Sequence, residues 1–302
     1  MSASQRDVKT RIGSVKNIQK ITRAMEMVAA ARLRRAEQRI AALRPYAGAI
    51  RRMTRQAAEA AGSSEINALP ILKEHESENN IALLLVTGDR GLAGAFNSQI
   101  VRAGLRAGRE HESDGRGVLF SAVGRRGVST LTFRGKDPVG RYVGFTDRPA
   151  YADARAIAEE LIALYVDGKA DRVEIFYNGY VSPLTQEVRR ETLLPLQQAT
   201  ILEGAEGEDD EEQAGQRALV EYEPDPQEIL AKLVPDYVEI SVYRALLEST
   251  ASEHGARMTA MRNASQNAGE LIEDLTLEMN RARQAEITQE IMEVVAGAES
   301  LT

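Results

Sequence analysis

A glycine-rich turn that follows an apolar strand can bind a phosphate group, and this chain has one such segment. Residues 81–87 (IALLLVT) form a continuous apolar run, and residues 88–94 (GDRGLAG) follow it, before a helical stretch. A dinucleotide fingerprint needs glycine at position 90, where this chain has Arg90, and the Lys-Ser/Thr pair of a Walker motif is missing. The pattern favours a structural turn, with a phosphate or nucleotide site as the less favoured alternative.

The three histidines offer no second candidate site. His75 and His111 each lie in a Glu-His-Glu-Ser tetrapeptide, and His254 lies in a long helical stretch. No HExxH or other close His-carboxylate spacing predicts a metal site, and no GxSxG segment predicts a nucleophile. Cysteine is absent, which excludes thiolate sites and disulfides. We expect His75 and His111 to be solvated loop residues, and we expect no catalytic, cofactor-binding or metal-binding residue.

The elements around the glycine-rich turn alternate between strand and helix. Gly117–Val123 and residues 172–181 are predicted strands, and Tyr151–Val166 is a predicted amphipathic helix. Together with the strand at 81–87 they predict a parallel sheet in a Rossmann-like α/β domain over residues 75–202. Residues 203–225 hold ten acidic residues and one arginine, which predicts a solvated insert.

Long helices are predicted on both sides of this domain. The first covers residues 1–61, with a bend or break at Pro45 and a stop at residues 62–64 (GSS). Its predicted apolar stripe is Ile18, Ile21, Met25, Val28, Leu33, Ala36, Ile40 and Leu43. The second covers residues 226–302 and carries a heptad seam. This seam is Leu233, Tyr237, Ile240, Arg244, Leu247, Ala251, His254, Met258, Met261, Ser265, Ala268, Ile272, Leu275, Met279 and Ala282.

Charge and composition indicate that the two helices pair with each other. The chain has a net charge of −7, yet residues 1–60 hold 14 basic and 4 acidic residues. All aromatic residues fall between Tyr46 and Tyr243, so the flanks contain no large ring. We infer an antiparallel intramolecular coiled coil of a basic and an acidic helix, with the α/β domain inserted between them. Nucleic-acid binding is disfavoured because the basic flank lacks stacking groups.

Three long segments closely resemble the gamma subunit of F-type ATP synthases. They are residues 11–30 (RIGSVKNIQKITRAMEMVAA), 87–97 (TGDRGLAGAFN) and 282–291 (ARQAEITQEI). Residues 222–226 (YEPDP) and 257–261 (RMTAM) support the resemblance, which covers nearly the whole chain in order. The resemblance implies a central-stalk rotor subunit, with the terminal coiled coil inside a hexamer of three alpha and three beta subunits. It implies further contacts with the epsilon subunit and the c-ring.

The resemblance also assigns contact residues by position. Met25, Arg283, Gln284 and Thr288 fall in the beta-subunit contact zone, and Arg257 falls in a coupling helix. Tyr222 and Glu223 fall in the foot that meets the membrane ring, which places the foot in the acidic segment 203–225. Ile291, Val294, Val295 and Leu301 fall in an apical bearing. None of these is a catalytic group.

The implied location is the cytoplasmic face of a bacterial plasma membrane, where the protein is peripheral and does not insert into lipid. The acidic insert is longer than we expect of a compact bacterial member, so its role stays open. One alternative is a nucleotide-binding α/β enzyme with a coiled-coil assembly arm.

Overall fold

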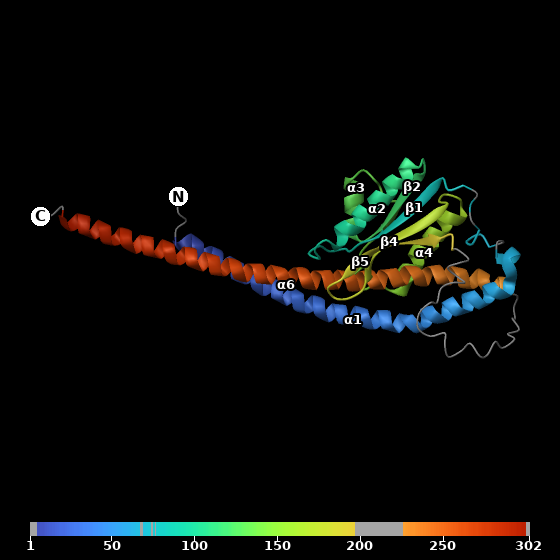
Figure 1. The fold of residues 1–302 in the computed structure, drawn as a ribbon, viewed down its shortest axis with the longest axis horizontal. Helices are drawn as coiled ribbons and strands as arrows, with labels where there is room; N and C mark the ends of the chain where they lie inside the picture. Colours follow the sequence, from blue (N-terminus) through green and yellow to red (C-terminus); the bar gives the residue numbers. More distant parts are fainter. Residues whose placement is uncertain (1–4, 67–68, 74, 76, 197–225, 300–302) are drawn as a thin grey trace. The chain divides into compact units, whose positions relative to one another are not determined.

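Along the chain, an α/β domain lies between two long helices. A computed structural model describes residues 5–66, 69–73, 75, 77–196 and 226–299 (Figure 1). Helix α1 spans Gln5–Ile66 and helix α6 spans Pro226–Glu299. The chain divides into two compact units, residues 1–31 with 257–302 (the terminal unit) and residues 32–256 (the domain unit). The elements of the α/β domain are β1 (Asn80–Val86), α2 (Phe96–Ser113), β2 (Gly117–Val123), α3 (Arg125–Phe133), β3 (Gly140–Tyr142), α4 (Tyr151–Val166), β4 (Arg172–Tyr180) and β5 (Gln186–Leu194).

The domain unit is a five-stranded sheet with helices on both faces. The strand order is β3-β2-β1-β4-β5, and β1 is parallel to both β2 and β4. In β1, Ile81, Leu83 and Leu85 belong to a core shared with α2 and α3. The alternate residues Ala82, Leu84 and Val86 belong to a core shared with α4 and α6. Figure 1 shows these two pairs of helices on opposite sides of the sheet. Burial on both faces explains why β1 is a continuous apolar run.

The predicted α/β fold between two terminal helices is confirmed, with one correction to the sheet. β1, β2, α4 and β4 occupy their predicted positions within one residue at each end. The prediction of a wholly parallel sheet was wrong, because β5 pairs antiparallel with β4. β5 has alternating burial and five charged or amide side chains, so it lacks the apolar run that marks a central strand. The short elements α3 and β3 were also missed.

In the terminal unit, α1 and α6 form an antiparallel pair. Val8 and Ile12 share a buried cluster with Leu275. Further along α1, the side-chain amide of Gln19 donates to the Ser265 carbonyl (3.4 Å). Arg262 then pairs with Glu26 (2.9 Å). Residues later in α1 therefore contact residues earlier in α6. The two helices run in opposite directions, as predicted for an antiparallel coiled coil.

The seam of α6 is confirmed, whereas the first half of the predicted α1 stripe was wrong. Ile18, Ile21 and Val28 are 53%, 59% and 54% exposed. The buried or half-buried residues of α1 repeat instead at alternating steps of four and three: Val8, Ile12, Val15, Gln19, Thr22, Glu26 and Ala29. Two stripes with helical spacing exist on this helix, and the less apolar one faces α6.

Helix α1 is also continuous at both positions where an interruption was predicted. Pro45 lies inside the helix, and residues 62–64 are helical up to the end at Ile66. A proline removes one backbone hydrogen bond, which packing of the helix against other elements can offset. That packing is present here, since Ile50 and Ala57 share a buried cluster with Leu230 and Val234 of α6.

Candidate functional site

The glycine-rich loop after β1 is held by its own neighbours. The Gly88 amide donates to Asn97 Oδ1 (2.8 Å), and the Asp89 amide donates to Thr146 Oγ1 (2.9 Å). The carboxylate of Asp89 accepts hydrogen bonds from the amides of Arg125 (3.0 Å) and Gly144 (2.9 Å). The two amides at the start of the loop are therefore already engaged and cannot cradle a phosphate. These contacts agree with the interpretation of the loop as a structural turn that ties together the ends of β1, β2 and β3.

Helix α6 fills the crevice at the carboxyl ends of the strands, where ligands bind in open α/β sheets. A Cβ atom built on Gly88 would lie 2.7 Å from Glu253 Oε2 of α6. Glu253 is 1% exposed. The cavity lined by Thr87, Thr146 and Glu253 has a volume of about 10 Å³, which is room for about one water molecule. The crevice is too small for a nucleotide, and the nearby carboxylate would repel the phosphates of a nucleotide.

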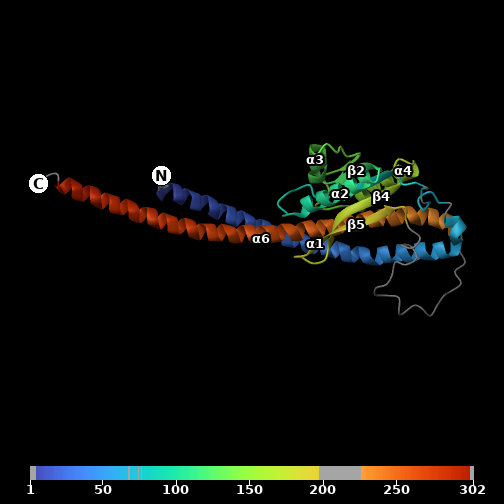
Figure 2. The ribbon, with the colours of Figure 1, turned by 45° about the horizontal axis from the view of Figure 1, so that its top comes forward.

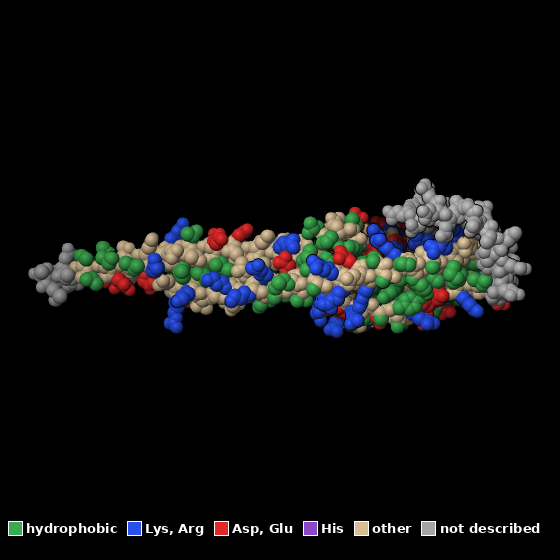
Figure 3. Space-filling model, turned by 90° about the horizontal axis from the view of Figure 1, so that it is seen from below, with side chains coloured by type: hydrophobic (Ala, Val, Ile, Leu, Met, Phe, Trp, Pro, Cys, Tyr) green, Lys and Arg blue, Asp and Glu red, His purple; other side chains and the backbone are tan. Residues whose placement is uncertain are grey.

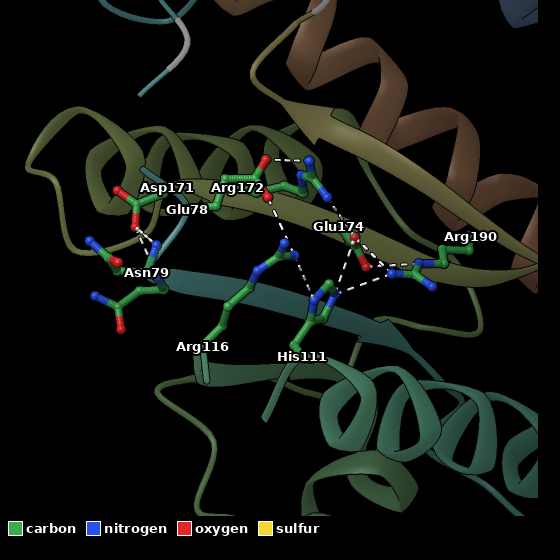
Figure 4. A network of polar contacts seen from close by, with 9 residues as sticks. Glu78, Asn79, His111, Arg116, Asp171, Arg172, Glu174 and Arg190 are labelled. Atoms are coloured by element: carbon green, nitrogen blue, oxygen red, sulfur yellow. Dashed lines mark hydrogen bonds and ion pairs between the residues drawn. The ribbon is translucent and has the colours of Figure 1, made fainter. Parts of the chain in front are cut away.

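The prediction of a solvated loop residue was wrong for His111, whereas His75 does lie in a loop, with 28% of its side chain exposed. His111 lies in the last turn of α2 and is 4% exposed. Its ring nitrogens lie 3.3 Å from Arg116 Nη1 and 3.1 Å from Arg190 Nη2 (Figure 4). His75 Nδ1 lies 3.0 Å from Asp171 Oδ1. The contacts with Arg190 and Asp171 could not be read from the local sequence, because these partners are 79 and 96 residues away.

The surroundings of His111 form a polar network at the amino ends of β1 and β4. Glu174, which is 2% exposed, accepts two hydrogen bonds from Arg190, at 2.9 and 3.0 Å. Arg172 pairs with Glu78, and Arg116 approaches the same carboxylate (3.4 Å; Figure 4). Glu174 and Glu78 thus each have a guanidinium partner, which indicates a structural role. Among the described residues, no group of three or more histidines and carboxylates could hold a metal ion.

Arg244 joins α6 to the sheet through hydrogen bonds to two strands. Its Nη2 donates to Glu191 Oε2 of β5 (2.6 Å), and its Nη1 donates to the hydroxyl of Tyr177 in β4 (3.1 Å). Arg189 of β5 pairs with Glu248 of α6 (3.0 Å). Figure 2 shows β5 beside α6, as Figure 1 does. Sequence analysis placed Arg244 in the helical seam and missed these partners.

The charges around Arg244 shift two pKa values. Burial by itself lowers the pKa of Arg244, but Glu191, Tyr177 and Glu248 raise it well above its usual value. Burial also raises the pKa of Tyr177 to about 12; Arg244 opposes this shift and the hydrogen bond to Glu191 adds to it. Arg244 is therefore permanently charged and Tyr177 is neutral at physiological pH.

Further contacts join both long helices to the domain. The Ser252 hydroxyl of α6 donates to the Asn178 carbonyl (3.0 Å), and Tyr151 donates to Glu239 (2.8 Å). On α1, Arg32 pairs with Asp147 at 2.6 Å. The α/β domain is thus bound to α1 and α6 by several polar contacts in addition to the apolar core.

The residues assigned by resemblance do not converge on one pocket. Arg283, Gln284 and Thr288 are all exposed on α6, and Met25 is half-buried on α1. Ile291, Val294 and Val295 are 57%, 72% and 48% exposed. Arg257 is buried. Tyr222, Glu223 and Leu301, together with the acidic insert, lie outside the described residues.

Comparison with known proteins identifies the family. The ATP synthase family matches residues 4–301. The ATP synthase gamma chain of Rubrobacter xylanophilus is 44% identical over 299 residues, which cover 99% of both chains. That of Streptomyces coelicolor is 43% identical over 305 residues, covering 100% of this chain and 97% of its own. This chain belongs to the ATP synthase gamma-chain family.

Solved structures agree with this family. The central stalk/c-ring structure of the Tetrahymena thermophila mitochondrial ATP synthase contains a chain 27% identical to this one, with a TM-score of 0.60. The match covers 81% of this chain and 99% of that one. A chain of the Euglena gracilis mitochondrial ATP synthase has a TM-score of 0.66 at 18% identity, over 98% of this chain and 94% of that one, and shows the shared fold. In the described part of the gamma-family chain, no helix has the length and apolarity needed to cross a membrane.

Proposed function

We propose that the chain is the rotor of the central stalk, coupling ion flow through the membrane ring to ATP synthesis or hydrolysis at the alpha/beta catalytic sites. Its partners in this role are three alpha and three beta subunits, the epsilon subunit and the c-ring. The chain itself supplies no catalytic group, and it lies peripherally at the cytoplasmic face of a bacterial plasma membrane. Membership of the gamma-chain family supports this role.

The proposal rests on the hydrogen bonds and ion pairs that join the α/β domain to α1 and α6. A shaft transmits torque only if the part that is driven cannot turn relative to the part that drives. Arg244 with Glu191, and Arg189 with Glu248, join α6 to the sheet at 2.6 and 3.0 Å. Breaking such partly buried pairs is costly, so they resist sliding of the helix over the sheet.

The exposed side chains of the terminal unit are the proposed contacts with the alpha/beta hexamer. Arg283, Gln284 and Thr288 are exposed on α6, and Met25 adjoins the exposed apolar stripe that contains Ile21. Ile291, Val294 and Val295 supply the apical bearing. Arg257 acts in the coupling helix, and Tyr222 with Glu223 forms the foot. Apolar side chains left exposed on a helix are suited to burial by a partner.

A rotor couples three catalytic sites by contacting each of them differently. A contact with the rotor shifts a catalytic site between two conformational states only if the affinity of the contact differs between those states. By thermodynamic linkage, the state of the site changes the affinity of the contact by the same factor. Exposed, charged side chains such as Arg283 can form and break these contacts at low cost because they stay hydrated.

A reversible cross-link tests this role. The natural chain has no cysteine, so Gln284→Cys places a single thiol in the proposed beta contact. A reducible thiol-specific photo-cross-linker on this thiol should couple the chain to the beta subunit in the assembled complex. We expect the cross-link to stop ATP hydrolysis by the complex, and reduction to restore it.

The matched control is Arg102→Cys, an exposed position on α2 of the domain unit. The same reagent there should leave hydrolysis unchanged. Full hydrolysis by a complex in which Gln284→Cys is cross-linked would contradict the rotor role.

A further inference from the structure

A basic cleft in the domain unit has the size of a small-molecule site. Its volume is about 560 Å³, within the range of about 300–1,000 Å³ typical of ligand pockets. Arg32, Arg35 and Arg39 of α1 form one wall, since residues three and four apart share a helix face. Arg148 also lines the cleft, together with the buried side chains of Leu247, Thr250 and His254 of α6. Figure 3 shows Lys and Arg side chains gathered in groups on the face seen from below.

The cleft has more arginine side chains than carboxylates to neutralise them. Its one carboxylate, Asp147, already pairs with Arg32 (2.6 Å) and Arg90 (3.4 Å). The side chains of Arg35, Arg39 and Arg148 have no carboxylate within 4.0 Å in the described part of the chain. Three guanidinium groups without a carboxylate partner therefore line the cleft.

The chemistry of the lining favours a phosphate chain as the ligand. A guanidinium group binds phosphate oxygens through two parallel hydrogen bonds, and arginines on both sides can hold successive phosphates. The described lining contains no Phe, Tyr or Trp ring on which a base could stack, and its one imidazole, that of His254, is only 1% exposed. Recognition should therefore depend on the phosphates and not on an attached nucleoside.

We propose that this cleft binds the diphosphate or triphosphate moiety of a small molecule through Arg35, Arg39 and Arg148. The ligand class includes inorganic polyphosphate and nucleoside triphosphates, which share the recognised group. This site adjoins the filled crevice at Gly88, with which it shares Thr250, and it does not depend on the rotor role.

Titration calorimetry of the full chain with inorganic tripolyphosphate, ATP and adenosine tests the proposal. At matched ionic strength we expect tripolyphosphate and ATP to bind one per chain with similar affinity, and adenosine not to bind. Replacing one guanidinium group removes charged hydrogen bonds, so Arg39→Gln should weaken tripolyphosphate binding roughly tenfold. Arg35→Gln/Arg39→Gln should weaken it further.

The control variant is Arg102→Gln/Arg106→Gln. It removes two exposed arginines at similar helical spacing from α2 and should leave binding unchanged. Equal weakening by this variant, no tripolyphosphate binding, or tight binding of ATP alone would overturn the proposal. So would a decaglutamate peptide that binds the cleft more tightly than tripolyphosphate, because that result would identify an acidic protein segment as the ligand.

Discussion

At the scale of single residues, Arg244 connects helix α6 with strands β4 and β5. It reaches Glu191 of β5, Tyr177 of β4 and Glu248 on its own helix. Three acceptors for one guanidinium group explain why an arginine is accommodated inside an otherwise apolar seam. The cost of removing it is expected to come mostly from the carboxylates that lose their partner.

Arg244→Ala should therefore lower the free energy of unfolding by about 2–4 kcal/mol. Urea denaturation of the isolated chain measures this change. Arg141→Ala is the control, because its pair with Asp137 lies at the surface and is worth about 0–1 kcal/mol. Similar losses for both variants would contradict the role given to Arg244.

Tyr177 makes the stability of the domain depend on pH in the alkaline range. Its pKa is about 12 in the folded protein against an ordinary value of 10.0, so between these values only the unfolded chain loses this proton. Its contribution to stability is complete below pH 10 and is lost as the pH rises towards 12. Tyr177→Phe should make the measured fall in unfolding free energy over this range shallower. An unchanged slope would show that Tyr177 does not titrate differently on folding.

At the scale of elements, α1 carries two apolar stripes with different purposes. The stripe through Val8, Ile12 and Ala29 is buried, and the one through Ile18, Ile21 and Val28 is exposed. A helix that packs only against α6 needs one stripe, so the second is available for other subunits.

Matched isoleucine variants separate these two stripes. Ile12→Ser should destabilise the isolated chain by about 3 kcal/mol, because it replaces a buried side chain with a polar one. Ile21→Ser should change stability by less than about 0.5 kcal/mol, yet weaken assembly with the alpha and beta subunits. Denaturation and reconstitution of the complex measure the two effects. An Ile21→Ser chain that assembles normally would exclude the exposed stripe as a partner surface.

Among the strands, sequence patterns predicted the three central ones and missed β3 and β5 at the edges of the sheet. β1 and β4 were found because apolar runs mark strands covered on both faces. β5 was missed because its exposed face is charged. The α1 seam was misassigned because Gln19, Thr22 and Glu26 occupy seam positions, so periodicity favoured the stripe richer in apolar residues. Glu191, Arg190 and Arg32, which pair with Arg244, Glu174 and Asp147 respectively, are distant from them in the chain and carry no local signal.

At the scale of the whole molecule, the terminal segment of α6 is expected to act on partners and not on the fold. Its side chains from Arg283 to Ala296 are exposed in the described structure, so they add little to folding. Removing residues 282–302 should leave the unfolding midpoint of the isolated chain nearly unchanged. The same truncation should reduce the torque of hydrolysis-driven rotation in a single-molecule assay. Undiminished torque would show that no essential contact zone lies in this segment.

The central claim is that the α/β domain and the long helices turn together as a rotor. The most direct measurement is single-molecule rotation of an immobilised alpha/beta complex, with a probe attached at Arg102→Cys on α2. We predict continuous rotation of the probe in one direction during ATP hydrolysis. Because α6 is fastened to the sheet, Arg244→Ala should make the probe slip, which lowers its torque. A probe that stays still while the complex hydrolyses ATP would contradict the account.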